Sequence, residues 1–293
     1  MDVIYRLLDT DGHNVTLFEK SRGVGGRCST RYINDKLIDH GTPYFHSTNN
    51  EFIEFCGSKV EENILVKKEK YYYPTNGINK LCSSMIHEDD LIKNTKIKSC
   101  EFINEKWTLI DENNIIYKNF DKLILTIPAP QILQMDIKLI DKIVDKLECV
   151  KYNSIATLLL YSYTLVNIMN PILINNKNFK KIVNNSSKYS YDNFSSYVIH
   201  LSEELTNGQN FQSKDEVLEF VKKRVYIDTG INLEDDFHIQ PHFWKYAFVS
   251  KSINDDFIYD KKNCIGICGD YFNGEDLEGS YMSSKRLYEH EFK

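Results

Sequence analysis

The order of the first elements constrains the fold most strongly. A helical apolar segment, Ile4 to Leu8, is followed by a turn at Asp9 to Gly12 and by an apolar strand, Val15 to Phe18, which ends on the acidic residue Glu19. This is the order of the second half of a βαβ unit that binds dinucleotides, where the carboxylate accepts hydrogen bonds from the adenosine ribose. Many α/β proteins carry an acidic residue after a strand, so the pattern needs a second observation.

The glycine-rich turn that usually confirms such a unit is absent. In G-x-G-x-x-G the glycines lie between the first strand and the helix and bring backbone N–H groups close to a pyrophosphate. Counting back about 20 residues from Glu19 places the third glycine at or before Met1. We therefore expect the first strand and the phosphate loop to be missing from this chain. Each charge-assisted hydrogen bond lost in this way weakens cofactor binding by roughly 1.5–3 kcal/mol.

Size and charge exclude several classes of protein. A chain of 293 residues can form two domains, and a formal charge of -6 provides no basic footprint for nucleic acid. The apolar run Ile155 to Leu160 is shorter than the ~20 residues of a membrane span, so we interpret it as a buried strand. Met1 to Leu8 lacks the pattern of a secretory signal. We expect a cytoplasmic protein without a membrane or nucleic-acid partner.

The seven cysteines do not form a recognisable framework. Their number is odd and no C-x-x-C pair occurs, which argues against both a disulfide scaffold and a zinc site, and we expect no metal. Cys264 and Cys268 lie four residues apart in an apolar stretch. We expect them to be buried, reduced thiols on one face of a strand.

Periodicity and composition predict further elements. A helix fits Ile78 to Ile86, helical spacing continues from Gln131 to Leu147, and an amphipathic helix covers Lys214 to Val225. The stretch Asn175 to Asn185 is rich in Asn and Lys and is predicted to be a loop. A final helix is expected from Gly279 onward.

A glycine-rich loop with an arginine follows the acidic residue. The segment from Val15 through Gly25-Gly26-Arg27 is similar to the hallmark of flavoproteins in the glutathione-reductase-like superfamily. Glycine allows close backbone approach, and arginine offers a planar fork to phosphate oxygens. The chain as a whole resembles the renalase-like oxidoreductases of the flavin amine oxidase-like superfamily. The collinear matches that carry this resemblance are Cys28–Arg31, Asp39–Gly41, Tyr44–Phe45, Asp121, Pro128–Gln131, His242–Ala247, Cys268–Asp270 and Leu277–Ser280.

This resemblance implies an α/β fold with two domains. One is a Rossmann-like, glutathione-reductase-like FAD-binding domain, and the other is an α+β substrate domain on a mixed or antiparallel sheet. The FAD-binding domain would be discontinuous, comprising 1–45, 76–128 and 255–293 without its first strand and phosphate loop. The substrate domain would comprise 46–75 and 129–254.

The resemblance also assigns roles to residues. Glu19 would bind the adenosine ribose, Arg27 the phosphates and Asp270 the ribitol or pyrophosphate, while Asp39-His40-Gly41 would pass close to the flavin ring. Glu278-Gly279 would present backbone N–H groups at a helix start. The complete set of expected cofactor-binding residues is Glu19, Lys20, Gly25, Gly26, Arg27, Thr30, Asp39, His40, Gly41, Gly269, Asp270, Glu278 and Gly279.

The expected substrate pocket is aromatic. Tyr44, Trp244 and Tyr246 would line it, although Trp and Tyr at such strand positions also pack protein cores. His40 and His242 are candidates for a general base, and each could equally be a hydrogen-bonded buried histidine. Hydride transfer to a flavin needs only alignment and a dry pocket, so the catalytic residues stay unassigned.

The implied activity is that of an FAD-dependent oxidoreductase. Hydride would pass from a dihydronicotinamide nucleotide, in an isomeric form, or from another small molecule to FAD, and dioxygen would reoxidise the flavin. One alternative is an amine oxidase or desaturase on the same scaffold. The other is a degenerate, non-catalytic remnant that lacks FAD, which the absent glycines would explain.

Overall fold

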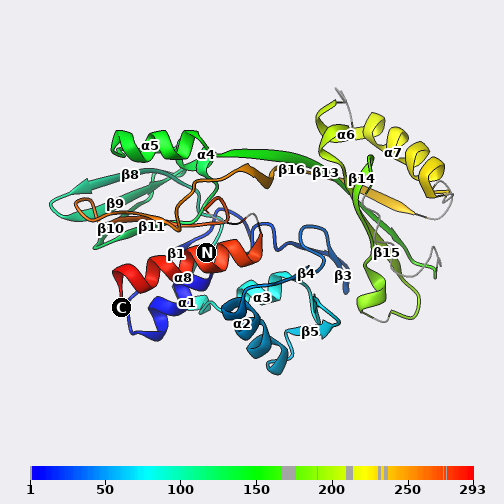
Figure 1. The fold of residues 1–293 in the computed structure, drawn as a ribbon, viewed down its shortest axis with the longest axis horizontal. Coiled ribbons are helices and arrows are strands. Elements are labelled where there is room, and N and C mark those ends of the chain that lie inside the picture. Colours follow the sequence, from blue (N-terminus) through cyan, green and yellow to red (C-terminus); the bar gives the residue numbers. More distant parts are fainter. Residues whose placement is uncertain are drawn as a thin grey trace.

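Two regions are joined by a pair of long strands (Figure 1). The computed structural model describes residues 2–165, 176–189, 191–208, 214–229, 232–233, 237–272, 274 and 276–293. Helices α1 (Asp2–Thr10) and α8 (Leu277–Glu291) lie in one region, and α7 (Lys214–Thr229) lies in the other. Strands β13 (Lys151–Ser162) and β16 (His238–Lys251) run from the first region into the second.

The first region contains two small sheets with parallel strands. Strand β1 (Leu17–Phe18) pairs with β7 (Leu91–Ile92), and β11 (Leu123–Leu125) pairs with β18 (Ile265–Ile267), which also pairs antiparallel with β17 (Ile258–Asp260). Within the described residues, no backbone ladder joins the two sheets. The helix α1 leads into the parallel strand β1, which is the Rossmann-like α/β arrangement that the sequence predicts.

Helices α1 and α8 pack against each other. Ile4 and Leu8 of α1 share a buried cluster with Leu287 and Tyr288 of α8 and with Cys268 after β18. The two helices therefore bury apolar side chains against each other.

An antiparallel meander flanks these sheets. Strands β8 (Ile97–Ile103), β9 (Lys106–Asp111) and β10 (Ile116–Phe120) pair in order, and β12 (Asp136–Ile137) adds a parallel edge to β8. Two helices cover it, α4 (Ala129–Ile132) and α5 (Asp141–Glu148). The core below them includes Trp107, Ile132, Ile143 and Leu147.

A third group of elements follows the N-terminal loop. Strands β2 (Thr30–Ile33) and β3 (Lys36–Asp39) form a hairpin. The remaining elements of this group are β4 (Phe45–His46), α2 (Asn50–Glu61), β5 (Leu65–Lys68), β6 (Tyr71–Pro74), α3 (Asn79–Ser83) and the 3₁₀ turn η1 (Glu88–Asp90). Helix α2 begins where the Asn49 side chain accepts hydrogen bonds from the Glu51 and Phe52 amides.

The second region is a four-stranded antiparallel sheet. Its order is β14 (Phe179–Asn184), β15 (Ser195–Leu201), β13 and β16. On one face, Leu158 and Ile199 pack against Val221 and Val225 of α7, and the short helix α6 (Glu203–Gly208) precedes α7. On the other face, Leu159 and Val198 pack against Ile38 of β3. This sheet therefore has one face turned to α7 and one turned to the β2–β3 hairpin.

Strand β16 carries an irregularity. Phe248 pairs with Asn153 and Trp244 pairs with Ile155, so four steps along β16 match two steps along β13. Such a bulge bends the strand and leaves the extra residues outside the ladder.

The α/β fold class is confirmed, and the helix expected at Lys214 to Val225 is present as α7. The loop expected from Asn175 to Asn185 is wrong, because β14 occupies Phe179–Asn184 and buries Phe179, Ile182 and Val183 against the sheet. Asn175 itself lies outside the described residues. Polar composition predicted this stretch incorrectly, because its apolar residues are few but all buried.

Other elements differ in extent. The helix expected at Ile78 to Ile86 is shorter, Asn79–Ser83, and the helical run expected from Gln131 to Leu147 is interrupted by β12. Cys264 is not a buried strand residue, because it is partly exposed and its φ of 50° places it in a turn before β18. The predicted residue limits of the two domains stay predictions. In the described part of the chain, no helix is both long and apolar enough to cross a membrane.

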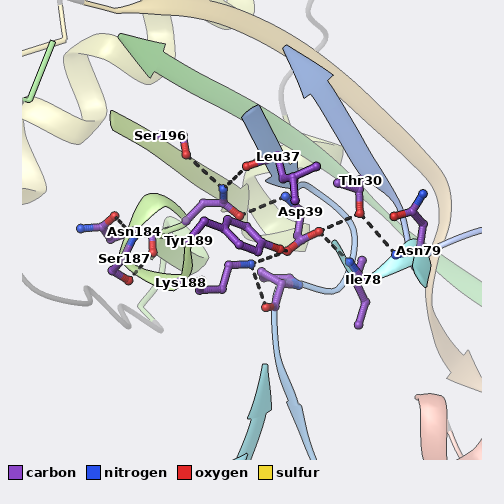
Figure 2. Close-up of polar contacts among 12 residues, drawn as sticks. Thr30, Leu37, Asp39, Ile78, Asn79, Asn184, Ser187, Lys188, Tyr189 and Ser196 are labelled. Carbon is purple, nitrogen blue, oxygen red and sulfur yellow. Dashed lines mark hydrogen bonds and ion pairs between the residues drawn. The ribbon is translucent and has the colours of Figure 1, made fainter. Parts of the chain in front are cut away.

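A buried polar network connects the β2–β3 hairpin with the second region (Figure 2). Asp39 is 0% exposed, and its Oδ1 accepts hydrogen bonds from Thr30 Oγ1 at 2.7 Å and from the Ile78 amide at 2.9 Å. Its Oδ2 accepts from Lys188 Nζ at 2.5 Å and from the Tyr189 hydroxyl. Both residues belong to or adjoin the 3₁₀ turn η2 (Ser186–Lys188), which follows β14.

The backbone beside Asp39 is held in the same way. The Asp39 amide donates to Asn185 Oδ1 at 3.0 Å, and Asn185 Nδ2 donates to the Leu37 carbonyl at 2.7 Å. Asn185 also donates to Ser196 of β15 at 3.0 Å. These contacts fix the hairpin against the sheet.

We expect Asp39→Asn to lower the free energy of unfolding by about 3–5 kcal/mol, because Lys188 would keep a buried charge without its partner. Urea unfolding of the variant checks this. The double variant Asp39→Asn with Lys188→Met should regain part of the loss. Asp35→Asn, which removes an exposed carboxylate beside Lys36, is the matched control and should leave the unfolding midpoint almost unchanged.

Candidate functional site

The acidic residue after β1 is buried and held in place. Glu19 Oε1 accepts a hydrogen bond from the Ser21 amide at 2.7 Å, and the Glu19 amide donates to the Ile92 carbonyl at 2.9 Å. Lys20 is exposed instead, and its Nζ donates to Gln131 Oε1 at 3.2 Å. The strand end therefore presents Glu19 to the interior and Lys20 to the surface.

The two glycines Gly25 and Gly26 of the following loop differ in how closely other backbone atoms approach them. Gly25 has a φ of 110°, and a Cβ there would lie 2.6 Å from the Cys28 carbonyl oxygen, so the turn itself requires glycine. Gly26 has a φ of 54°, and a Cβ there would meet nothing within 4 Å. The backbone at Gly26 is thus open to an approaching group.

Arg27 connects this loop with the turn after β18. Its Nη1 donates to Asp270 Oδ2 at 2.6 Å and to the Ala247 carbonyl at 3.2 Å. Burial alone would lower the pKa of Arg27, but the Asp270 carboxylate outweighs burial and raises it. Helix α8 holds the turn that contains Asp270, because the Gly269 amide donates to Ser283 Oγ of that helix at 3.1 Å. Residues 243 positions apart in the sequence thus meet in one ion pair.

The segments around Arg27 and His40 run side by side. The His40 amide donates to the Ser29 carbonyl at 3.1 Å, and a Cβ on Gly41 would lie 1.9 Å from the Arg27 carbonyl oxygen. Gly41 is therefore required for close backbone contact. Thr30 and Asp39, both expected near the cofactor, bind each other within the network of Figure 2.

Three rings form a cluster behind this contact. The His40 ring lies 5.4 Å from Trp244, nearly stacked, and 5.0 Å from His242, which lies 4.3 Å from Trp244. His40 is buried, and burial, with His242 and Arg31, lowers its pKa to about 4. Burial and Arg31 also lower the pKa of His242. Both imidazoles are therefore neutral at pH 7.

Polar atoms in this cluster are buried without a hydrogen-bond partner among the described residues. They are Nδ1 of His40, Nε1 of Trp244, Nε of Arg31 and Oγ1 of Thr157. Buried polar groups in folded proteins almost always have partners, so each of these atoms needs an explanation.

The sequence did not single out two residues beside this cluster. His200 is buried, its Nε2 donates to the His40 carbonyl at 2.9 Å, and burial lowers its pKa to about 3, assisted by Lys181. Lys181 Nζ lies 4.3 Å from the centre of the Tyr44 ring, and burial lowers its pKa to about 8. Lys181 lies on β14 and His200 on β15, and the way in which these strands pair cannot be read from the local sequence.

The other expected pocket residues lie in two places. Tyr44 belongs to an aromatic group with Tyr71 and Tyr73, at ring distances of 5.3 Å and 5.8 Å. Tyr246 contacts Tyr152 at 5.4 Å, on the bulged part of β16. Only Trp244 of the three lies in the His40 cluster.

At the start of α8, the Gly279 amide and the Glu278 carboxylate already form hydrogen bonds with other protein groups. The Gly279 amide donates to the Asp276 side chain at 3.1 Å, and a Cβ on Gly279 would lie 2.6 Å from Gly274. Glu278 Oε2 accepts from Ser47 Oγ at 2.5 Å and from the Thr48 amide at 3.0 Å. Burial would raise the pKa of Glu278, but these hydrogen bonds outweigh burial and lower it. Glu278 and Gly279 thus have structural roles here.

A small cavity lies elsewhere, between the loop at Gly23 and Val24, helix α3 and strand β7. Its volume is about 130 Å³, and none of the expected site residues lines it. Small-molecule sites usually span about 300–1,000 Å³. This cavity is separate from the residues around Arg27 and His40.

Comparison with a protein family supports the nucleotide-binding region. Residues 3–57 match the family described as an NAD(P)-binding Rossmann-like domain. The matched segment runs from α1 through Glu19, the Gly25-Gly26-Arg27 loop and Gly41 into α2.

Solved structures of several enzymes have a similar fold. Cyclohexylamine oxidase from Brevibacterium oxydans IH-35A matches with a TM-score of 0.74 at 7% identity, over 99% of this chain and 95% of that chain. A CLA-producing fatty acid isomerase from P. acnes matches with a TM-score of 0.70 at 10% identity, over 100% and 96%. A protein assigned as a protoporphyrinogen oxidase from Exiguobacterium sp. 255-15 matches with a TM-score of 0.58 at 14% identity, over 80% and 54%.

The chain thus spans about half the length of the last of these proteins and nearly all of the other two. Their three names describe different reactions, so the shared property is the fold. This chain is an α/β protein with the fold of these structures, and its residues 3–57 match a Rossmann-like domain of the NAD(P)-binding kind.

Proposed function

We propose that the protein is an FAD-dependent oxidoreductase that oxidises a dihydronicotinamide nucleotide, in an isomeric form, with dioxygen as the final acceptor. The proposal rests on one observation. Arg27, which ends the Gly25-Gly26-Arg27 loop, forms an ion pair with Asp270, with 2.6 Å between Nη1 and Oδ2. The ring cluster of His40, His242 and Trp244 lies beside this loop. The fold supports the proposal, because oxidases occur among the similar structures.

The residues present fit a flavin nucleotide. Among the described residues, both hydrogen bonds of the Arg27 guanidinium come from Nη1, which leaves its Nε and Nη2 donors for phosphate oxygens. The open backbone at Gly26 adjoins them, and Glu19 lies at the strand end suited to a ribose. The unpartnered atoms of His40 and Trp244 offer hydrogen bonds to a bound ring system.

The chain's own groups would position the reactants. When bound, FAD would supply a hydride acceptor that dioxygen can reoxidise. Trp244 and the two histidines would shield a substrate bound against their rings from water. Loss of a hydride from a dihydronicotinamide releases no proton, so the neutral imidazoles of His40 and His242 would contact the substrate ring without acting as a base, and they would not repel the cationic ring that results.

A second candidate is an amine oxidase on the same scaffold. The similarity to cyclohexylamine oxidase favours it, and the Gly25-Gly26-Arg27 loop does not separate the two. Release of peroxide from amines but not from nucleotides would support this candidate. A protein that stays colourless with FAD would support the non-catalytic remnant.

The first test is flavin binding and reduction. The 293-residue chain is purified alone and, in parallel, with the codons that precede Met1 translated, and each preparation is supplied with FAD. We expect a yellow protein that bleaches anaerobically with a dihydronicotinamide nucleotide isomer and recovers its colour with dioxygen, producing peroxide. The proposal is overturned if neither preparation binds FAD, or if the FAD-bound protein does not bleach.

Arg27→Lys should weaken FAD binding by about tenfold or more, because lysine keeps the charge opposite Asp270 but loses the planar fork. Flavin fluorescence titration measures the change in Kd. Arg22→Lys, on the exposed part of the same loop, is the matched control and should bind FAD as the wild type does. Equal weakening in both variants would contradict a specific role for Arg27.

The neutral histidines predict a dependence of stability on pH. Their folded pKa values, about 4 for His40 and about 3 for His200, lie below the usual 6.5, so only the unfolded chain binds these protons as the pH falls from 6.5 to 4. Each histidine should therefore lower the free energy of unfolding by up to ~1.4 kcal/mol per pH unit in this range. His40→Gln should reduce that slope in urea unfolding measured at several pH values. An unchanged slope would show that His40 titrates normally.

A further inference from the structure

One row of residues crosses the four-stranded sheet of the second region. Lys181 of β14 pairs with His200 of β15, His200 pairs with Thr157 of β13, and Thr157 pairs with His242 of β16. Residues directly opposite each other on antiparallel strands point to the same face of the sheet. The four side chains therefore share one face.

That face is turned toward the β2–β3 hairpin. Leu159 and Val198, two positions along from Thr157 and His200, pack against Ile38 of β3. His200 reaches the carbonyl of His40, and His242 contacts its ring. The opposite face, with Leu158 and Ile199, is closed by α7. The polar row thus lies at the site of the proposed function.

Two cations border the row without an ion pair in the described part of the chain. Lys181 lies at one end of the row, over the Tyr44 ring. Burial lowers the pKa of Lys181, and the neighbouring cation Lys180 lowers it further. Arg31 of β2 is close enough to His40 and His242 to lower the pKa of both. Most of the other lysines and arginines near the row are paired, such as Lys188 with Asp39 and Arg27 with Asp270.

The row also contains unsatisfied hydrogen-bonding groups. Among the described residues, Thr157 Oγ1, His40 Nδ1 and Arg31 Nε are buried atoms without a hydrogen-bond partner, and the Thr157 and His40 side chains are buried as a whole. A bound molecule with acceptor oxygens would satisfy several of them together.

We infer that Arg31 and Lys181 are the charge-recognition residues of this face and that its substrate is an anion carrying a phosphate or carboxylate group. The inference deepens the proposed function, because it names the charge of the molecule bound at the same site. Unpaired cations with low-dielectric surroundings attract anions and repel ammonium groups. The face therefore suits a nucleotide and opposes a protonated amine.

Calorimetric titration of the full chain tests the inference with three probes. Nicotinamide mononucleotide and nicotinamide riboside differ only by the phosphate, and benzylamine is a cation of similar ring size. We expect the mononucleotide to bind about tenfold or more tightly than the riboside, with benzylamine weakest. Inorganic phosphate should compete with the mononucleotide.

Variants assign the preference to residues. Arg31→Gln and Lys181→Gln should each reduce the mononucleotide-to-riboside affinity ratio several-fold, whereas Lys181→Arg should retain it. Lys96→Gln removes an exposed lysine paired with Glu112 on the distant meander and should leave the ratio unchanged. Thermal unfolding of each variant verifies that it is folded.

Several results would overturn the inference. These are equal affinity for mononucleotide and riboside, tighter binding of benzylamine, or the same loss in Lys96→Gln as in the two site variants. The result is separable from the flavin test. If the protein is colourless but its mononucleotide-to-riboside affinity ratio depends on Arg31, the inference stands and the proposed function is rejected. If the protein is yellow, is reduced by amines and has an affinity ratio of one, the inference is rejected.

Discussion

A single buried carboxylate holds the site together. Asp39 points away from the four-stranded sheet, toward Lys188, Tyr189 and the start of α3, so that its neighbours Ile38 and His40 must point toward the sheet. Burying a charge is costly, and the cost is offset only because both oxygens are fully hydrogen-bonded. If this contact were absent, neither the packing of Ile38 nor the position of the His40 ring would be determined.

The sequence predicted what local patterns can encode. A helix, a strand, an acidic strand end and the Gly25-Gly26-Arg27 loop together indicated the Rossmann-like region, since each depends on a few neighbouring residues. The partners of Asp39 and the row from Lys181 to His242 were missed. They depend on register between strands that are distant in sequence, and the same polar stretch that hid β14 also hid Lys181 and Lys188.

Charge, more than fold, distinguishes the possible substrates. The similar structures include an amine oxidase and a fatty acid isomerase, so the scaffold accommodates unlike molecules. The protein as a whole is acidic, with a formal charge of -6, yet the face around His40 carries neutral imidazoles and two cations that form no ion pair with any residue the structure describes. A local potential opposite to the net charge is typical of a surface shaped for one ligand.

The bulge in β16 links the two ends of the site through one strand. Its extra residues stand outside the ladder with β13, and the Ala247 carbonyl among them accepts from Arg27, while His242 and Trp244 lie on the regular part. Because β16 is an edge strand, the bulge changes the position and direction of this carbonyl relative to His242 and Trp244. Shortening β16 to a regular ladder would therefore shift the guanidinium of Arg27 relative to the rings, which the proposed function assigns to opposite ends of one ligand.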